Sequence, residues 1–136
     1  MTHQKAEIIG YLGADPEMRF TPSGQPVANF SVAANRKYKN AAGDEVKETA
    51  WFKVSAWGKL AEVCNNYLHK GSQVYVEGRL VVDPATGGPR IWTRQDGSPA
   101  ASFEINAATV RFLGGKNGNG NGEAPSEPAS EDQVPF

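Results

Sequence analysis

Residues 49–57 carry the side chains whose types and spacing best predict a chemical role. Successive side chains of a strand point to opposite faces, so Trp51, Lys53 and Trp57 share one face and an apolar set occupies the other. A flat aromatic ring stacks on any nucleobase, and a lysine neutralises a phosphate. Packing under a loop or a neighbouring subunit would account for a single tryptophan. Two tryptophans flanking a lysine favour a nucleic-acid-binding face.

Two further clusters combine aromatic and basic residues. The first consists of Arg36, Lys37, Tyr38 and Lys39, and it precedes a predicted hairpin tip at residues 42–44. The second surrounds Trp92, within residues 90–94. Each cluster alone is typical of a solvated hairpin. On a common barrel, both would extend one groove for a strand of nucleic acid.

Residue combinations typical of catalysis or metal binding are missing. His3 and His69 are isolated, and Cys64 lies on the apolar stripe of a predicted helix. The Gly-Gly-Lys run at residues 114–116 lacks the upstream glycine and the following Ser or Thr of a phosphate-binding loop. We therefore expect a protein that is not an enzyme and that needs no cofactor or metal.

The elements that must position these residues are mostly strands. Period-two patterns predict strands at residues 6–11 (continued at 17–20), 27–35, 49–57, 73–82 and 101–112. Apolar residues at helical spacing predict one helix over residues 59–69, with Gly71 as its C-terminal cap glycine. Five strands with a helix between the third and fourth predict an all-β, Greek-key oligonucleotide-binding (OB) barrel.

The composition changes after residue 113. Residues 1–113 contain 13 Lys and Arg against 11 Asp and Glu, a net charge of +2, whereas residues 114–136 contain one lysine and four acids. Residues 114–130 are rich in Gly, Asn and Pro and contain no large apolar side chain. This composition predicts a barrel over residues 1–113, a disordered linker over 114–130, and an acidic tip over 131–136 that ends in Phe136.

The sequence also predicts a cellular location. No apolar run approaches the roughly 20 residues that span a bilayer, and no secretory signal is apparent at residues 1–5. Cys64 is the only cysteine, which fits a reducing compartment. We expect a cytoplasmic protein without membrane contact.

Several motifs resemble the bacterial single-stranded-DNA-binding protein family. They are residues 12–17 (LGADPE), 19–20 (RF), 27–30 (VANF), 57–62 (WGKLAE) and 67–78 (YLHKGSQVYVEG). The resemblance covers nearly the whole chain. It implies an OB barrel that binds single strands without sequence preference during replication, recombination and repair, is associated with the nucleoid, and assembles as a homotetramer.

The resemblance also assigns roles to residues. The family's stacking positions correspond to Tyr38, Trp51, Trp57 and Trp92. With the basic cluster above, its phosphate contacts comprise Arg36, Lys37, Lys39, Lys53, Lys59 and Lys70. The family's acidic tip recruits replication and repair enzymes, and here it consists of Glu131, Asp132, Val134, Pro135 and Phe136. Gln133 separates the acids from the last three residues, which departs from the family's pattern. Because Phe136 and its carboxylate are kept, we expect the tip to remain functional.

Two other functions share parts of this pattern. An RNA-binding barrel would have the same aromatic and basic face, but it would have no use for an acidic tip ending in phenylalanine. A protein-interaction adaptor would use the tip alone and would leave Trp51, Trp57 and Tyr38 unexplained. Comparing ribo- and deoxyribo-oligonucleotides, or replacing the tryptophans, separates these alternatives.

Overall fold

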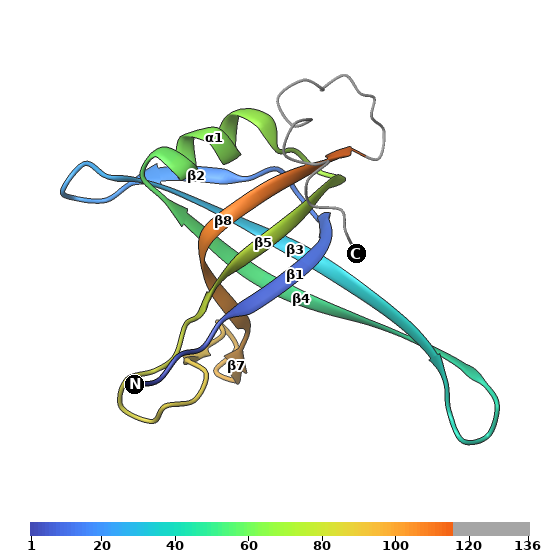
Figure 1. Ribbon diagram of the computed structural model, residues 1–136. Helices are drawn as coiled ribbons and strands as arrows, with labels where there is room; N and C mark the ends of the chain where they lie inside the picture. The colour runs from blue at the N-terminus through green and yellow to red at the C-terminus, as the bar shows by residue number, and fades with distance from the viewer. Residues whose placement is uncertain (116–136) are drawn as a thin grey trace.

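Five strands close into a barrel in the computed structural model, which describes residues 1–115 (Figure 1). They are β1 (Ala6–Leu12), β3 (Pro26–Lys39), β4 (Glu45–Trp57), β5 (Ser72–Leu80) and β8 (Phe103–Gly115). The sheet order is β1-β5-β8-β4-β3, and the pairing of Tyr11 with Ala33 and Leu12 with Val32 joins β3 back to β1. Only the β4–β8 pair is parallel within the described barrel. The predicted OB fold is confirmed.

Smaller elements decorate the barrel. The short strand β2 (Glu17–Phe20) pairs with the first residues of β3 at the sheet edge. Helix α1 (Lys59–Tyr67) follows β4 and packs against β3 and β4. The predicted excursion between the last two barrel strands contains a hairpin of β6 (Ile91–Thr93) and β7 (Pro99–Ala101). Figure 1 shows α1 and the β6–β7 hairpin at opposite ends of the barrel.

The core follows the alternation of the strands. Alternate residues of β3 and β4 are almost fully buried, as are their counterparts on β5 and β8, for example Val32, Val54, Val76 and Ile105. The residues between them face outward, which is the pattern expected of a small barrel filled by its own side chains. The packing of the inner face therefore fixes where the outer face of β4 points.

Helix α1 ends earlier than the sequence predicted. It stops at Tyr67, because Leu68 adopts an extended conformation (φ −96°, ψ 149°) that is incompatible with another helical turn. Leu68 is buried in the core, and the chain then turns at Gly71 (φ +89°), whose N–H donates to the carbonyl of Leu12 (2.9 Å). The predicted cap glycine is thus a turn residue ahead of β5. At nine residues, the only helix within residues 1–115 is far too short to cross a bilayer.

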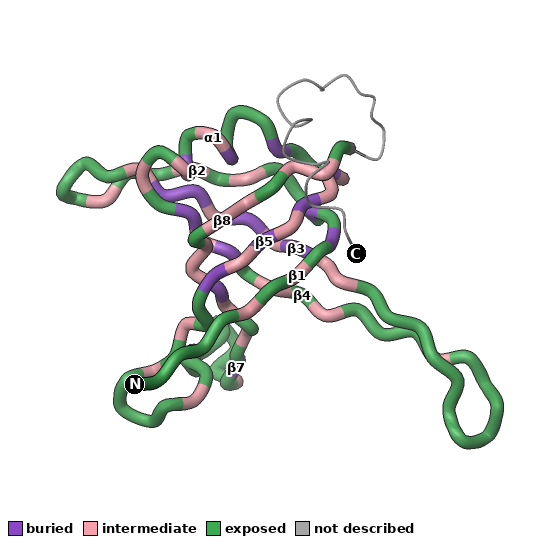
Figure 2. Tube along the Cα trace, in the orientation of Figure 1, coloured by how far each residue is buried: buried purple, intermediate pink, exposed green. Residues whose placement is uncertain are grey.

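The β3–β4 hairpin extends well beyond the barrel. Both strands are longer than predicted, and they remain paired from Val27 and Trp57 out to Lys39 and Glu45. Figure 1 shows the hairpin projecting away from the barrel, and Figure 2 shows that its outer part is almost entirely exposed. Its position therefore depends on the cross-strand pairing alone.

Candidate nucleic-acid interface

The outer face of β4 presents the predicted aromatic and basic side chains. Trp51 is 51% exposed and Trp57 is 42% exposed, and Lys53 between them is exposed as well. The fourth member, Ser55, donates a hydrogen bond to Oδ1 of Asn29 on β3 (2.8 Å). Because the intervening residues of β4 are anchored in the core, the barrel holds these side chains along one line on its surface.

An open groove of about 990 Å³ runs along this face. Its walls come from β2, β3, β4, β6, β8, the loop between β1 and β2 and the segment between β5 and β6. They include Asn29, Lys53, Trp57, Trp92 and Asn106. Nε1 of Trp57 donates a long hydrogen bond to Oδ1 of Asn106 on β8 (3.5 Å), so two residues of the groove are in contact. Aromatic rings, amides and a lysine in one concave surface suit a chain of bases and phosphates.

Trp92 reaches this groove from the β6–β7 hairpin. Nζ of Lys53 lies 4.9 Å from the centre of the Trp92 ring, and Cζ of Arg94 lies 6.0 Å from it. Both distances fall within the range of cation–π attraction. Arg90, at the start of the same hairpin, forms an ion pair with Glu104 of β8. The structure therefore brings Trp92 together with Lys53 of β4, although 38 residues separate them in the sequence.

Trp51 rests on Gly13. A Cβ atom added to Gly13 would lie 2.7 Å from Cζ3 and 2.8 Å from Cη2 of the indole, closer than real Cβ contacts. The backbone of Gly13 does not adopt a positive φ, so its conformation is open to any residue. The absence of a side chain at position 13 thus makes room for the Trp51 ring, whose atoms are the only ones within 4 Å of the added Cβ.

Phe103 is an aromatic residue on this side of the molecule that sequence reasoning missed. It has the parity of the core residues of β8, yet it is 60% exposed. With Trp51, Lys53 and Gly13 it lines a second hollow of about 600 Å³. Phe103 is the third residue of the predicted last strand and follows a turn-rich segment closely. This position was the available signal, because side chains at the end of a barrel are less completely covered than those in its middle.

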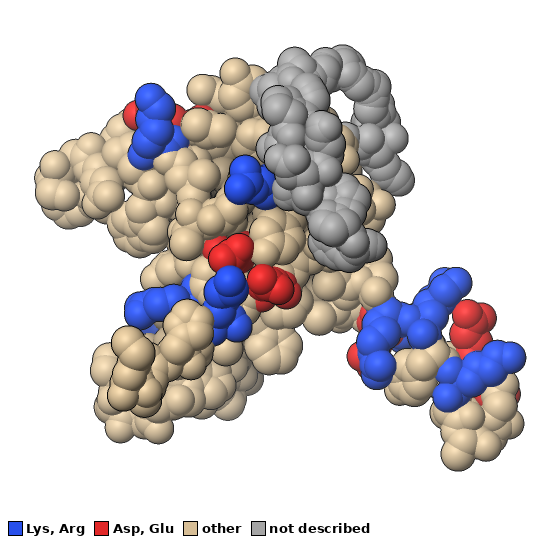
Figure 3. All heavy atoms as spheres, viewed as in Figure 1, with Lys and Arg blue, Asp and Glu red and all other residues tan. Residues whose placement is uncertain are grey.

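The basic cluster of the β3–β4 hairpin is paired with acids. Arg36 Nε donates to Glu48 (2.9 Å), and Lys37 forms an ion pair with Glu45 (3.6 Å). The hydrogen bond to Glu48 raises the pKa of Arg36 above its ordinary value. The Arg36 guanidinium also covers the ring of Tyr38, with Cζ 4.5 Å from the ring centre. Figure 3 shows cations and carboxylates mixed on this projecting hairpin.

The remaining predicted basic residues do not line the groove. Lys59 is the first residue of α1, and Lys70 lies in the turn after it, where its backbone N–H donates to Oδ1 of Asp15 (2.8 Å). Both side chains are exposed, but neither lines the groove. Lys39 is exposed at the outer end of the β3–β4 hairpin. The structure therefore gathers Trp57, Trp92 and Lys53, and places the other cations around them.

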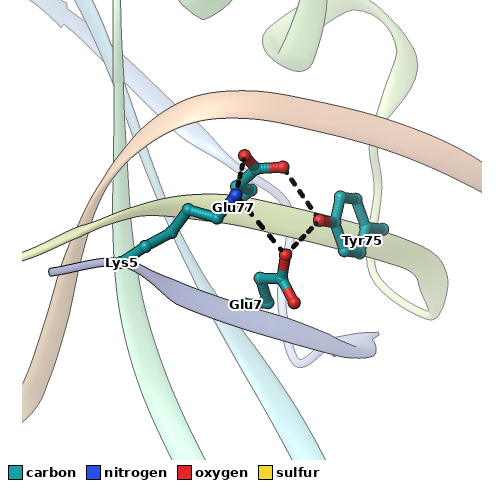
Figure 4. Close-up of polar contacts among 4 residues, drawn as sticks. All are labelled: Lys5, Glu7, Tyr75 and Glu77. Carbon is teal, nitrogen blue, oxygen red and sulfur yellow. Dashed lines mark hydrogen bonds and ion pairs between the residues drawn. The ribbon is translucent and has the colours of Figure 1, made fainter.

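A different polar cluster occupies the outer face of β1 and β5. Nζ of Lys5 lies 2.9 Å from a carboxylate oxygen of Glu77 and 3.7 Å from one of Glu7. The Tyr75 hydroxyl lies 3.1 Å from Glu7 and 2.9 Å from Glu77, so it bridges the two acids (Figure 4). Hydrogen bonds from Lys5 and then Tyr75 lower the pKa of Glu77. This cluster is fully paired and stands apart from the groove.

Groups typical of catalysis are not assembled in the part of the chain that the structure describes. Cys64 is fully buried, and burial raises the pKa of its thiol to about 12, so the reactive thiolate is scarce at neutral pH. Residues 1–115 hold no cluster of three His, Cys, Asp or Glu side chains arranged for a metal ion. Gly114 and Gly115, the first two residues of the predicted linker, form the end of β8. The rest of the linker and the tip residues Glu131, Asp132, Val134, Pro135 and Phe136 lie outside the described residues.

Comparisons with known proteins point to one family. The model of the single-strand binding protein family matches residues 3–113. The "single-stranded DNA-binding protein 1" of Chlorobaculum tepidum is 41% identical over 117 residues, which is 85% of this chain and 68% of the relative. The single-stranded DNA-binding protein of Neisseria meningitidis serogroup A is 39% identical over 127 residues, covering 93% of this chain and 68% of the relative.

Solved structures give the same result. A Plasmodium falciparum SSB in complex with ssDNA superposes with a TM-score of 0.69 at 25% identity, over 83% of this chain and 97% of that one. A deletion variant of the single-stranded DNA binding protein from Thermus aquaticus gives a TM-score of 0.65 at 26% identity, over 83% of this chain. The match spans about half of the Thermus protein (51%).

Proposed function

The chain belongs to the single-strand binding protein family, and we propose on that basis that it binds and protects single-stranded DNA, without sequence preference, during replication, recombination and repair. The observation that carries this proposal is the groove in which Trp57, Trp92 and Lys53 meet on the outer face of the barrel. Stacking needs only the flat face that every base has, so such a groove accepts any sequence. A duplex keeps its bases stacked on each other and offers the groove no free face.

The binding mechanism divides between rings and cations. We assign stacking to Trp51, Trp57, Trp92 and Tyr38, each of which contributes about 1–3 kcal/mol when a base is bound. We assign phosphate contacts to the basic residues Arg36, Lys37, Lys39, Lys53, Lys59 and Lys70. Each phosphate neutralised on a single strand contributes a log–log salt slope of about −0.7, so this part of the affinity weakens with salt. Stacking and phosphate contacts make or break no covalent bond, and we propose a binding protein without enzyme activity.

We further propose that four copies of the chain assemble, and the outer face of β1 and β5 is the surface that supports this. Ile9 and Tyr11 are partly exposed there, beside the paired cluster of Lys5, Glu7, Tyr75 and Glu77. Apolar residues next to satisfied charges are typical of a subunit interface. Light scattering should give a mass about four times the 14.6 kDa of the chain; a monomer at micromolar concentration would exclude the tetramer.

The last proposal concerns residues 114–136. We propose that residues 131–136 recruit replication and repair enzymes, tethered by residues 114–130 to the binding domain of residues 1–113. A tether raises the effective concentration of its tip near the bound DNA. The acids and the apolar side chains of residues 131–136 support this role. We further propose that the protein works in the cytoplasm, at the nucleoid.

Intrinsic tryptophan fluorescence tests the central proposal. Oligo(dT), a duplex of equal length and oligo(U) are titrated into the full chain at low and high salt. We expect strong quenching by oligo(dT), little by the duplex, and retention of oligo(dT) binding at high salt, because stacking does not depend on counterions. Tighter binding of oligo(U) would favour RNA as the ligand. No quenching, together with no binding in a mobility-shift assay, would leave an adaptor and overturn the proposal.

A further inference from the structure

Phe103 is a large apolar side chain that the barrel leaves uncovered. Ile105, two residues further along β8 and on the same face of the strand, is fully buried, whereas Phe103 is 60% exposed. The last pair between β5 and β8 joins Leu80 to Ile105, and the Val81 N–H then donates to the Glu104 carbonyl (2.9 Å), so Phe103 lies beyond the end of β5. Helix α1 covers the opposite end of the barrel (Figure 1). Phe103 is therefore exposed because it lies at the end of the barrel that α1 does not cover, past the last residue of β5.

The ring of Phe103 is nevertheless held in place. Phe103 pairs with Phe52 across the parallel β4–β8 ladder, and their ring centres lie 5.5 Å apart at an angle of 32°. Phe52 in turn packs against the core. One side of the Phe103 ring is therefore supported and the rest faces solvent. A ring held in advance loses little conformational freedom when a ligand covers it.

The hollow beside Phe103 continues the groove already described. Trp51 and Phe103 both line it, and Ala14, Ser31 and Lys53 line both the hollow and the groove. A single strand that follows the groove past Lys53 therefore arrives at this hollow. The hollow offers aromatic surface for a base, and Lys53 stands where a phosphate passes from one recess to the other.

We propose that this hollow is an additional base-binding subsite, in which Phe103 stacks on a nucleobase of the bound strand. The inference rests on the proposed single-stranded DNA binding and adds a residue to it. A phenyl ring has no hydrogen-bonding group, so the subsite accepts any base. The observation behind it is the combination of an exposed, supported ring with a recess that joins the main groove.

Two pairs of substitutions test the subsite in the full chain. Phe103→Leu removes the aromatic face but keeps apolar volume, and Phe103→Trp restores a face that reports on its own contacts. Tyr67 provides the matched control, because it too is exposed and supported by a phenylalanine (Phe112, 6.0 Å between ring centres), but it lies on α1 and lines neither recess. Tyr67→Leu and Tyr67→Trp therefore make the same chemical changes away from the proposed path.

The expected results differ between the two positions. Phe103→Leu should bind oligo(dT) about fivefold or more weakly, while Tyr67→Leu binds as the wild type does. Subtracting the wild-type emission isolates each added indole: the one at position 103 should be quenched by oligo(dT), and the one at position 67 should not. If Phe103→Leu is too unstable to assay, the quenching comparison decides alone.

The inference is overturned if the added indole at position 103 keeps its emission while the native tryptophans are quenched. It is also overturned if a folded Phe103→Leu variant binds with wild-type affinity. Both results leave the proposed function standing, because the wild-type chain still binds. Failure of the proposed function is recognised separately, by a wild-type chain that oligo(dT) neither quenches nor binds.

Discussion

The barrel groove and the β3–β4 hairpin contain the same kinds of side chain in different arrangements. In the groove, Lys53 lies over Trp92, and no salt bridge within residues 1–115 involves it. On the hairpin, Arg36 and Lys37 are each paired with a glutamate, and Arg36 covers Tyr38. An aromatic–basic cluster in a sequence therefore predicts where charge and rings occur, but not whether they are free to meet a ligand.

The groove and the β3–β4 hairpin also differ in the packing that fixes the positions of their side chains. The groove residues of β4 alternate with side chains that are almost completely buried, such as Val54 and Ala56. The hairpin residues alternate with other exposed residues, and exposed ion pairs contribute little to rigidity or stability. We therefore expect most of the affinity to come from rings fixed by the barrel, and the hairpin to add a smaller, salt-dependent part.

The strongest test of this comparison removes rings from each region. Trp51→Ala with Trp57→Ala should weaken oligo(dT) binding by at least about 30-fold, since each stack contributes about 1–3 kcal/mol. Tyr38→Ala should cost clearly less, because its ring is already covered by Arg36. Fluorescence anisotropy of labelled oligo(dT) at low and high salt measures both variants, with circular dichroism as the control for folding. A larger loss from Tyr38→Ala than from the double variant would reverse the comparison.

A second test asks whether the binding face of the barrel depends on the preset position of the Trp51 ring, which lines the hollow beside the groove. Gly13→Ala should push the Trp51 ring aside and lower oligo(dT) affinity by about 1 kcal/mol, part of one stacking interaction. It should not lower the melting temperature, because the added Cβ meets only this ring and alanine restricts the unfolded chain. Gly88→Ala is the matched control: Gly88 also lacks a positive φ, and a Cβ there lies 3.7 Å from its nearest neighbour, Thr86 Oγ1.

The combination of lower affinity with unchanged stability is what identifies a positioning role. Gly88→Ala should leave both quantities near the wild-type values or raise stability slightly. If Gly13→Ala binds as tightly as wild type, then the position of the Trp51 ring against Gly13 does not contribute to binding. The barrel face would then depend on preset ring positions no more than the hairpin does.

Sequence patterns predicted the fold well because alternate residues of the barrel strands face the core and the solvent, as the period-two pattern indicated. The alternation along residues 49–57 correctly separated the outward tryptophans from the core side chains, and the single helix between the third and fourth strands identified the OB order. The helix end was predicted two residues late, since burial of Leu68 overrides the helical periodicity. The spacing of residue types predicts local geometry, whereas tertiary packing decides which side chains enter the core and so where a helix ends.

The candidate site was predicted less completely, for two physical reasons. Alternation along β8 puts Phe103 on the same face as the buried Ile105, but it does not say where the neighbouring strand ends, and β5 ends before it reaches Phe103. The basic residues of the hairpin were predicted as phosphate contacts, and the sequence pattern did not reveal that the strand register brings Arg36 and Glu48 together as an ion pair. Both features depend on strand register, which the spacing of residue types within one strand does not contain.

The smallest expected effect concerns those hairpin ion pairs. Glu48→Gln should release Arg36 for a phosphate, and it should strengthen oligo(dT) binding at low salt by about 0.2–1 kcal/mol, the usual range of an exposed pair. The log–log salt slope should steepen by about 0.7, and the gain should vanish at high salt. Glu62→Gln on α1 changes the net charge equally without breaking a salt bridge within residues 1–115, so it controls for overall charge. Equal gains from both variants would mean that the hairpin acts only through net charge and that its pairing with Glu48 does not restrain Arg36.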